Sequence, residues 1–128
     1  MLKINNVELN MDVFDADFSE KVEAEMEKVV KESKNSDNRF KQGGLKRSQY
    51  LKQQCKIIFD FFDNIWGEGT HKKIFEERSN LKECIIAFER FVNAYKEENE
   101  KEAKEMQELT AKYSPNRVQR RNKNNKRR

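Results

Sequence analysis

The sequence predicts a mainly α-helical protein: a small N-terminal β-hairpin packed on a body of three or four helices, a long C-terminal helix and a disordered basic tail. Three observations predict this fold class. Only one proline and four glycines occur in 128 residues, so residues that break helices are scarce. Apolar residues recur at helical spacing in three long segments, and strict alternation occurs only near the N-terminus. Hydrophobic residues make up 35% of the chain and charged residues 39%, which indicates a lean core surrounded by solvated helices.

The first 14 residues alternate between apolar and polar side chains in two short runs. Asn5 and Asn6 separate the runs, and asparagine tolerates the positive φ angles that a two-residue turn requires. We therefore expect a β-hairpin within residues 1–14. Because two strands alone are marginally stable, the hairpin should pack on the helical body.

A first helix is predicted over about residues 18–33. Asp17 and Glu20 have the spacing of a capping box, and four apolar residues then follow at helical intervals: Phe18, Val22, Met26 and Val29. The next segment, residues 34–44, has no periodicity and ends in two glycines. We expect a mobile loop there.

A second helix is predicted from about Leu45 to Trp66, with Gly67 as its C-terminal stop. Stepping about 100° per residue places its apolar side chains on an arc about 200° wide. One neighbouring helix cannot cover so wide a face. We therefore expect this helix at the centre of the fold, with aromatic surface left exposed at its rim.

A short helix over residues 71–77, capped by Thr70, and a third long helix over about residues 81–112 complete the prediction. The third helix has a narrower apolar stripe, made of Leu81, Cys84, Ile85, Phe88, Phe91, Val92 and Tyr95. The stripe nearly vanishes after Tyr95, and Met106, Leu109 and Tyr113 then return in phase with it. Ser114 and Pro115 stop the helix. We expect one domain over residues 1–113 and a disordered basic tail over 114–128.

The sequence offers no pattern typical of an enzyme, a metal site or a cofactor site. His71 is the single histidine, and neither an orienting partner for a general base nor a zinc ligand set is recognisable around it. Asp60 and Asp63 fit the solvated back of the second helix, and Cys55 and Cys84 fit reduced core residues. The start of the chain lacks the apolar segment of a signal peptide, and no stretch approaches the length of a membrane span. These features predict a cytoplasmic, non-enzymatic protein that does not bind membranes.

Two surfaces are candidates for binding a protein partner. Phe61, Trp66 and Phe75 form the predicted aromatic rim, and aromatic side chains are favoured interface anchors. Met106, Leu109 and Tyr113 form the second surface, at the end of the third helix.

The tail after Pro115 holds seven basic residues and no acid: Arg117, Arg120, Arg121, Lys123, Lys126, Arg127 and Arg128. Subtracting these seven charges from the total of +4 leaves a net charge of −3 for the rest of the chain. Three interpretations of the tail stay open: a solubilising end, a sequence-independent contact to nucleic acid, or a contact to an acidic protein.

Three stretches resemble a known group of proteins: "MLKINNVELNMDVFDADFSEKVE", "FDFFDNIWGEGTHKKIFEERSNLKECIIAFERFV" and "SPNRVQRR". They are similar to segments of small proteins encoded among the tail genes of phages and prophages of Gram-positive bacteria. The resemblance implies a tail-assembly chaperone, which holds the tape-measure protein soluble and recruits tail-tube proteins in the host cytoplasm. The alternatives are a nucleic-acid-binding accessory that uses the basic tail and a minor structural tail protein.

Overall fold

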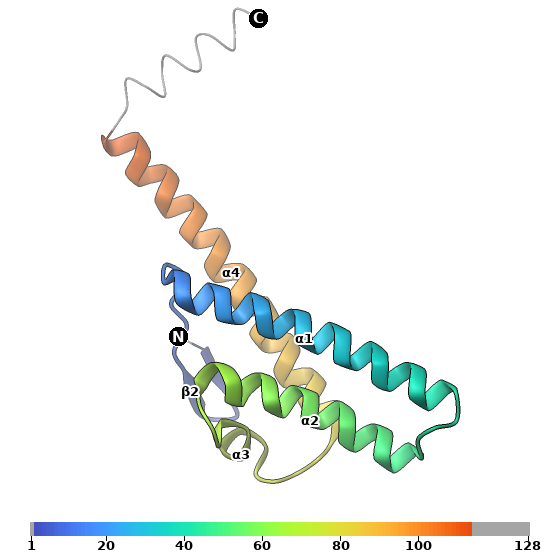
Figure 1. Ribbon diagram of the computed structural model, residues 1–128. Helices are drawn as coiled ribbons and strands as arrows, with labels where there is room; N and C mark the ends of the chain where they lie inside the picture. The colour runs from blue at the N-terminus through green and yellow to red at the C-terminus, as the bar shows by residue number, and fades with distance from the viewer. Residues whose placement is uncertain (1, 114–128) are drawn as a thin grey trace, which may run out of the picture. The chain divides into compact units, whose positions relative to one another are not determined.

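The computed structural model describes residues 2–113 and confirms the predicted fold class for them (Figure 1). An antiparallel two-stranded sheet precedes four helices. The elements are β1 (Leu2–Ile4), β2 (Val7–Leu9), α1 (Ala16–Lys41), α2 (Arg47–Trp66), α3 (Thr70–Phe75) and α4 (Leu81–Tyr113). The tail predicted to be disordered, residues 114–128, lies outside the described residues.

The chain forms two compact units, one up to Tyr95 and one from Lys96 onward. The prediction of a single domain over residues 1–113 did not anticipate this division. The boundary falls where the apolar stripe of the last helix weakens in the sequence. The first unit contains the hydrophobic core, and the described part of the second unit is the helical segment 96–113.

The predicted N-terminal hairpin is confirmed. Leu2 pairs with Leu9 and Ile4 pairs with Val7, and the turn residues Asn5 and Asn6 have φ angles of 48° and 68°. Ile4 and Leu9 point into the core. The Asn5 side-chain amide also donates a hydrogen bond to the Ile74 carbonyl at 3.1 Å, which fixes the turn against α3.

Helix α1 differs from its prediction at both ends. It begins at Ala16 because Asp15 is the N-cap, and the Asp15 carboxylate accepts a hydrogen bond from the Asp17 amide at 3.0 Å. The helix continues to Lys41, so the mobile loop predicted for residues 34–44 is wrong for most of its length. Gly43, at a φ angle of 80°, follows the end of the helix.

Polar contacts with α2 explain why α1 is longer than its apolar pattern. The Ser33 hydroxyl donates to the Gln54 side-chain carbonyl at 3.0 Å, and the Ser36 hydroxyl donates to that of Gln53 at the same distance. Tyr50 donates to the Asp37 carboxylate. Since these partners are polar, they leave no hydrophobic period in the sequence.

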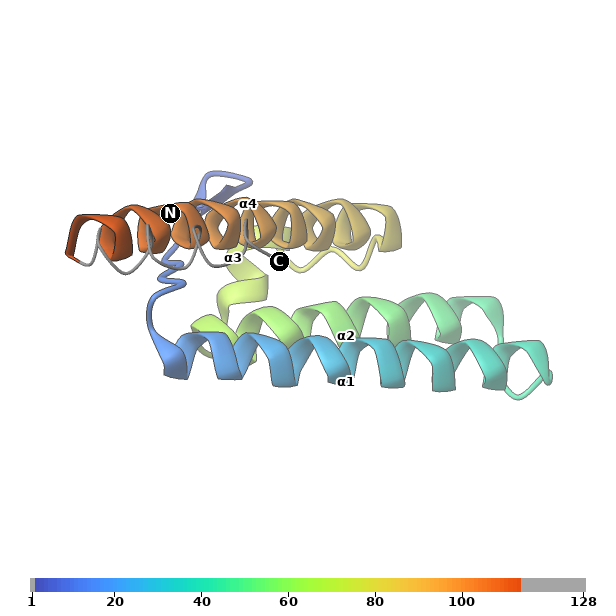
Figure 2. The ribbon, with the colours of Figure 1, turned by 90° about the horizontal axis from the view of Figure 1, so that it is seen from above.

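Helix α2 lies at the centre of the first unit, as predicted. Figures 1 and 2 show α1 and α2 side by side and antiparallel, and residues 81–95 of α4 lie on one side of this pair. Phe62 of α2 is fully buried, and its ring contacts Phe61, Trp66 and Phe75. The buried core also includes Val22, Val29, Cys55, Ile58, Ile65, Ile74, Cys84, Ala87 and Phe91.

The turn between α2 and α3 folds α3 back on α2. Gly69 is the N-cap of α3. The Thr70 hydroxyl donates a hydrogen bond to the Gly67 carbonyl at 2.7 Å. Thr70 is therefore the first residue of α3 and tightens the turn, so its predicted role as the helix cap is wrong. α3 ends at Phe75, two residues before the predicted end.

Candidate functional site

The aromatic rim predicted from Phe61, Trp66 and Phe75 is not a surface. Phe61 is 1% exposed and Phe75 is 0% exposed, so both are core residues and the predicted exposure of their rings to a partner is wrong. The Phe61 ring meets those of Phe88 and Phe91 of α4 at centroid distances of 5.0 and 5.2 Å. The wide apolar face of α2 is thus covered from several sides, by α1, α3 and the first part of α4, and the hairpin residues Ile4 and Leu9 belong to the same buried core.

Trp66 is half-buried and connects the segment that follows the β-hairpin with the core. Its indole Nε1 donates to the Asn10 carbonyl at 2.7 Å. The ring stacks on Phe62 at 5.8 Å and meets the edge of Phe91 at 5.4 Å. These contacts give Trp66 a structural role within the first unit.

The first unit instead exposes apolar surface at the start of α4. Ile85 and Ile86 are 43% and 45% exposed. Together with Leu51 and Leu81 they line an open cavity of about 520 Å³. Ile85 was predicted to belong to the buried stripe of this helix, and that prediction is wrong. Consecutive residues of a helix lie about 100° apart, so Ile85 and its sequence neighbours cannot all face the same core.

The second unit exposes two of the three residues predicted at the end of the long helix. Met106 is 48% exposed and Leu109 is 45% exposed. A hollow of about 500 Å³ lies along this face and is lined by Ala103, Met106, Gln107, Thr110 and Ala111. The side chain of Tyr113 lies outside the described residues. A partner contact at these positions stays a prediction.

Asp63 and His71 form a contact that the sequence reading missed. The Asp63 carboxylate accepts a hydrogen bond from the His71 backbone amide at 2.9 Å, and its second oxygen lies 2.6 Å from His71 Nδ1. The imidazole also stacks on the Phe59 ring at 4.6 Å. His71 therefore has an orienting partner, and Asp63 is not on a solvated face; both earlier interpretations are wrong. The contact exists because α3 folds back over α2, which no local spacing in the sequence signals.

Cys55 and Cys84 are free, fully buried thiols, as predicted. Burial raises the pKa of Cys84, and the neighbouring Cys55 raises it further. Burial also raises the pKa of Cys55, and a hydrogen bond that Cys55 accepts from Cys84 partly offsets this rise. Both thiols are thus held in their neutral, unreactive form.

These raised pKa values predict a loss of stability at alkaline pH. Below the ordinary thiol pKa of about 8.5, both states hold the proton and the full stability is present. Above it, the unfolded chain ionises first, so the free energy of unfolding falls by up to about 1.4 kcal/mol per pH unit for each thiol. We expect urea unfolding at pH 7.5 and 9.5 to show a smaller decrease for Cys84→Ala than for the unsubstituted protein. Equal decreases would contradict the prediction.

Two further properties of residues 2–113 concern metal binding and membrane crossing. Within this range no group of three His, Cys, Asp or Glu side chains is placed to hold a metal ion. In the same part of the chain, no helix combines the length and the apolar character needed to cross a membrane. The seven basic residues of the predicted tail site, Arg117 to Arg128, lie outside the described residues.

The fold and its surfaces define a small, mainly helical protein with an N-terminal β-hairpin and exposed apolar side chains on its last helix. The chain belongs to a family of unknown function, DUF6673, which matches residues 5–124. No curated protein and no solved structure gives a significant match.

Proposed function

We propose that this protein is a non-enzymatic accessory of phage morphogenesis, most like a tail-assembly chaperone, that acts in the host cytoplasm. Its partners would be the tape-measure protein and the tail-tube protein. The resemblance of the hairpin, the central aromatic block and the "SPNRVQRR" segment to small phage tail-region proteins supports this role.

One observation carries the proposal: the helical segment 96–113 keeps Met106 and Leu109 about half exposed. Residues three apart lie on the same face of a helix, so the two side chains form one apolar strip. Around this strip the segment is mostly charged, with six acids and four lysines. An amphipathic helix of this kind is suited to pack into an apolar groove of a partner or against a partner helix. Methionine adapts well to partners of different shape.

The partner contact is tested by replacing both strip residues with glutamate, Met106→Glu and Leu109→Glu. We expect the variant to fold but to lose co-purification with the proposed tape-measure partner, because two charges would be buried in an apolar contact. Co-expression followed by affinity purification, with the soluble fraction of the tape-measure protein as a second readout, measures both effects.

A matched control is Lys101→Ala with Lys104→Ala. It changes the net charge by the same −2 within the same helical segment, and both side chains are exposed. We expect it to retain the partner. Retention by the glutamate variant, or equal loss in both variants, would contradict the proposed surface. Mass spectrometry of purified particles provides a separate test, since a chaperone leaves before the virion is complete and a structural tail protein stays.

A further inference from the structure

Charge is strongly segregated within the first unit. Residues 28–56, which form the outer end of the α1/α2 pair, contain nine lysines and arginines and two acids, a net charge of +7. The other residues up to Tyr95 contain seven basic and fifteen acidic residues, a net charge of −8. We call residues 28–56 the basic hairpin end, after the helical hairpin that α1 and α2 form; this is not the N-terminal β-hairpin. The overall charge of the unit conceals this separation.

All nine basic side chains of the basic hairpin end are exposed. Of these nine side chains, all of which the structure describes, only Lys28 makes an ion pair, with Glu25 at 3.0 Å. Of the two acids, Asp37 is occupied by hydrogen bonds from Tyr50 and Gln54, which leaves Glu32 as the exposed acid of this segment. The charged side chains that this segment exposes to solvent are therefore positive in all but one case.

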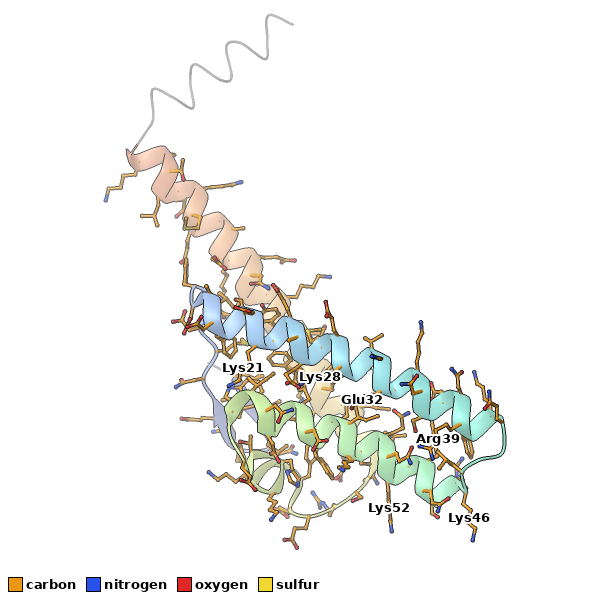
Figure 3. The ribbon with its side chains drawn as sticks, in the orientation of Figure 1. Lys21, Lys28, Glu32, Arg39, Lys46 and Lys52 are labelled. Atoms are coloured by element: carbon orange, nitrogen blue, oxygen red, sulfur yellow. The ribbon has the colours of Figure 1, made fainter. Side chains whose placement is uncertain are left out.

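The cations come from both helices and are brought together by the fold. Figure 3 shows Lys28, Glu32 and Arg39 along α1, Lys46 immediately before α2 and Lys52 near the start of α2. The α1 part of the basic hairpin end, residues 28–41, spans about 20 Å at 1.5 Å per residue. A DNA duplex of that length carries about twelve phosphate charges, one per 1.7 Å. The spacing suits contacts to several phosphates at once.

Polar side chains between the two helices add hydrogen-bond donors to this face. Asn35 and Gln53 line an open cavity of about 290 Å³ together with Arg39 and Lys56. Side-chain amide groups of this kind commonly contact phosphate oxygens beside arginine and lysine. Ser36 also lines the cavity, but its hydroxyl already donates to Gln53. Glu32 and Asp60 also line the cavity, so the attraction comes from the flanking cations and not from the cavity floor.

The composition of the surface favours nucleic acid over an acidic protein. A stable protein interface needs apolar or aromatic anchors at its centre, and Val30 is the one large apolar side chain exposed within residues 28–56. The two aromatic rings of the segment, Phe40 and Tyr50, stack on each other at 4.5 Å. They are thus engaged with each other and are not displayed for stacking on bases.

We propose that the basic hairpin end binds the phosphate backbone of nucleic acid without reading its sequence. This surface shares no residue with the apolar strip at Met106 and Leu109, and the proposal does not depend on the chaperone role. It also places a nucleic-acid contact on the folded body, in addition to any contact that the basic tail makes.

The experiment uses the full chain with the seven tail cations, Arg117 to Arg128, changed to glutamine, so that the tail does not contribute. Binding of a fluorescent DNA duplex of about 30 base pairs is followed by anisotropy at about 50 and 200 mM NaCl. With about five phosphate contacts, the affinity should fall about 500-fold between these two salt concentrations.

The decisive variant carries four further substitutions in this tail-neutralised chain: Arg39→Gln, Lys46→Gln, Lys52→Gln and Lys56→Gln. We expect it to bind at least about tenfold more weakly at the lower salt concentration and to lose most of the salt dependence. The matched control removes four exposed lysines from the acidic part of the unit, Lys3→Gln, Lys21→Gln, Lys72→Gln and Lys73→Gln, and has the same net charge. It should retain the affinity within about threefold, since these lysines lie away from the proposed contact.

Three results would overturn the proposal. One is an absence of DNA binding at low salt in the tail-neutralised chain. The second is an equal loss of affinity in the decisive variant and its control. The third is binding of polyglutamate with the same affinity and salt dependence as DNA, which would assign the surface to acidic polypeptides. Thermal unfolding of both variants verifies that they are folded, as expected for substitutions at exposed positions.

Discussion

Replacing Phe61 by alanine is expected to lower the free energy of unfolding by about 3–5 kcal/mol. The side chain is 1% exposed, and its ring contacts those of Phe62, Phe88 and Phe91 at centroid distances between 5.0 and 5.5 Å. Truncation removes the transfer free energy of the ring and leaves a cavity that rigid aromatic neighbours cannot fill. Since small domains have only about 5–15 kcal/mol of stability, the variant should be largely destabilised. Urea unfolding followed by circular dichroism measures the effect.

Phe14→Ala is the matched control, because it makes the same chemical change at a side chain that is 54% exposed. We expect a loss below about 1 kcal/mol at this position. If Phe61→Ala were as mild as Phe14→Ala while partner binding was lost, Phe61 would belong to a binding surface after all. A large loss of stability would instead establish it as a core residue and restrict partner contacts to other parts of the chain.

Where apolar residues pack against apolar residues, the sequence was sufficient to predict the fold. The hairpin followed from strict alternation and from two asparagines, whose backbone angles are those that the turn requires. Helix α2 followed from its apolar period and from Gly67, and the structure places its last residue at Trp66 as predicted. Such elements can be predicted from their own residues, because burial of one face places apolar residues at a fixed spacing along the segment.

Contacts between polar side chains of different elements could not be predicted in this way. The second half of α1 is held by Ser33, Ser36 and Asp37, whose partners lie on α2. The Asp63–His71 contact likewise joins two elements through a turn. A hydrogen bond between distant residues imposes no period on either segment, so only the three-dimensional arrangement reveals it.

The two surfaces of the first unit show the same limitation. The rim was predicted on α2 because its apolar arc is wide, but the number of elements that cover an arc depends on the fold and not on the helix itself. Aromatic side chains of α1, α3 and α4 contact the rings of α2, and the exposed isoleucines lie on α4. The basic hairpin end was missed because its cations are spread over 29 residues that also include a turn. They form one surface only because α1 and α2 lie antiparallel.

Replacing Gly67 by alanine is expected to lower the free energy of unfolding by about 1–3 kcal/mol through the backbone alone. Gly67 ends α2 with a φ angle of 113° and a ψ angle of 154°, a region that only glycine enters readily. A Cβ atom at this position would meet nothing within 4 Å, so steric contact with neighbours does not contribute. Urea unfolding of the variant measures the loss.

Gly69→Asn serves as the comparison, because Gly69 lies two residues away in the same turn and also has open space around it. Its φ and ψ angles, 92° and −4°, are left-handed, and asparagine tolerates that region better than other residues with a side chain. We expect a loss below about 1 kcal/mol. The turn returns α3 to α2, so strain at Gly67 should also weaken the contact between Asp63 and His71, visible as a shift of the His71 ring resonances in NMR spectra. Equal losses in the two variants would mean that the turn relaxes freely, and the fold-back of α3 would then be set by the burial of Ile74 and Phe75 instead.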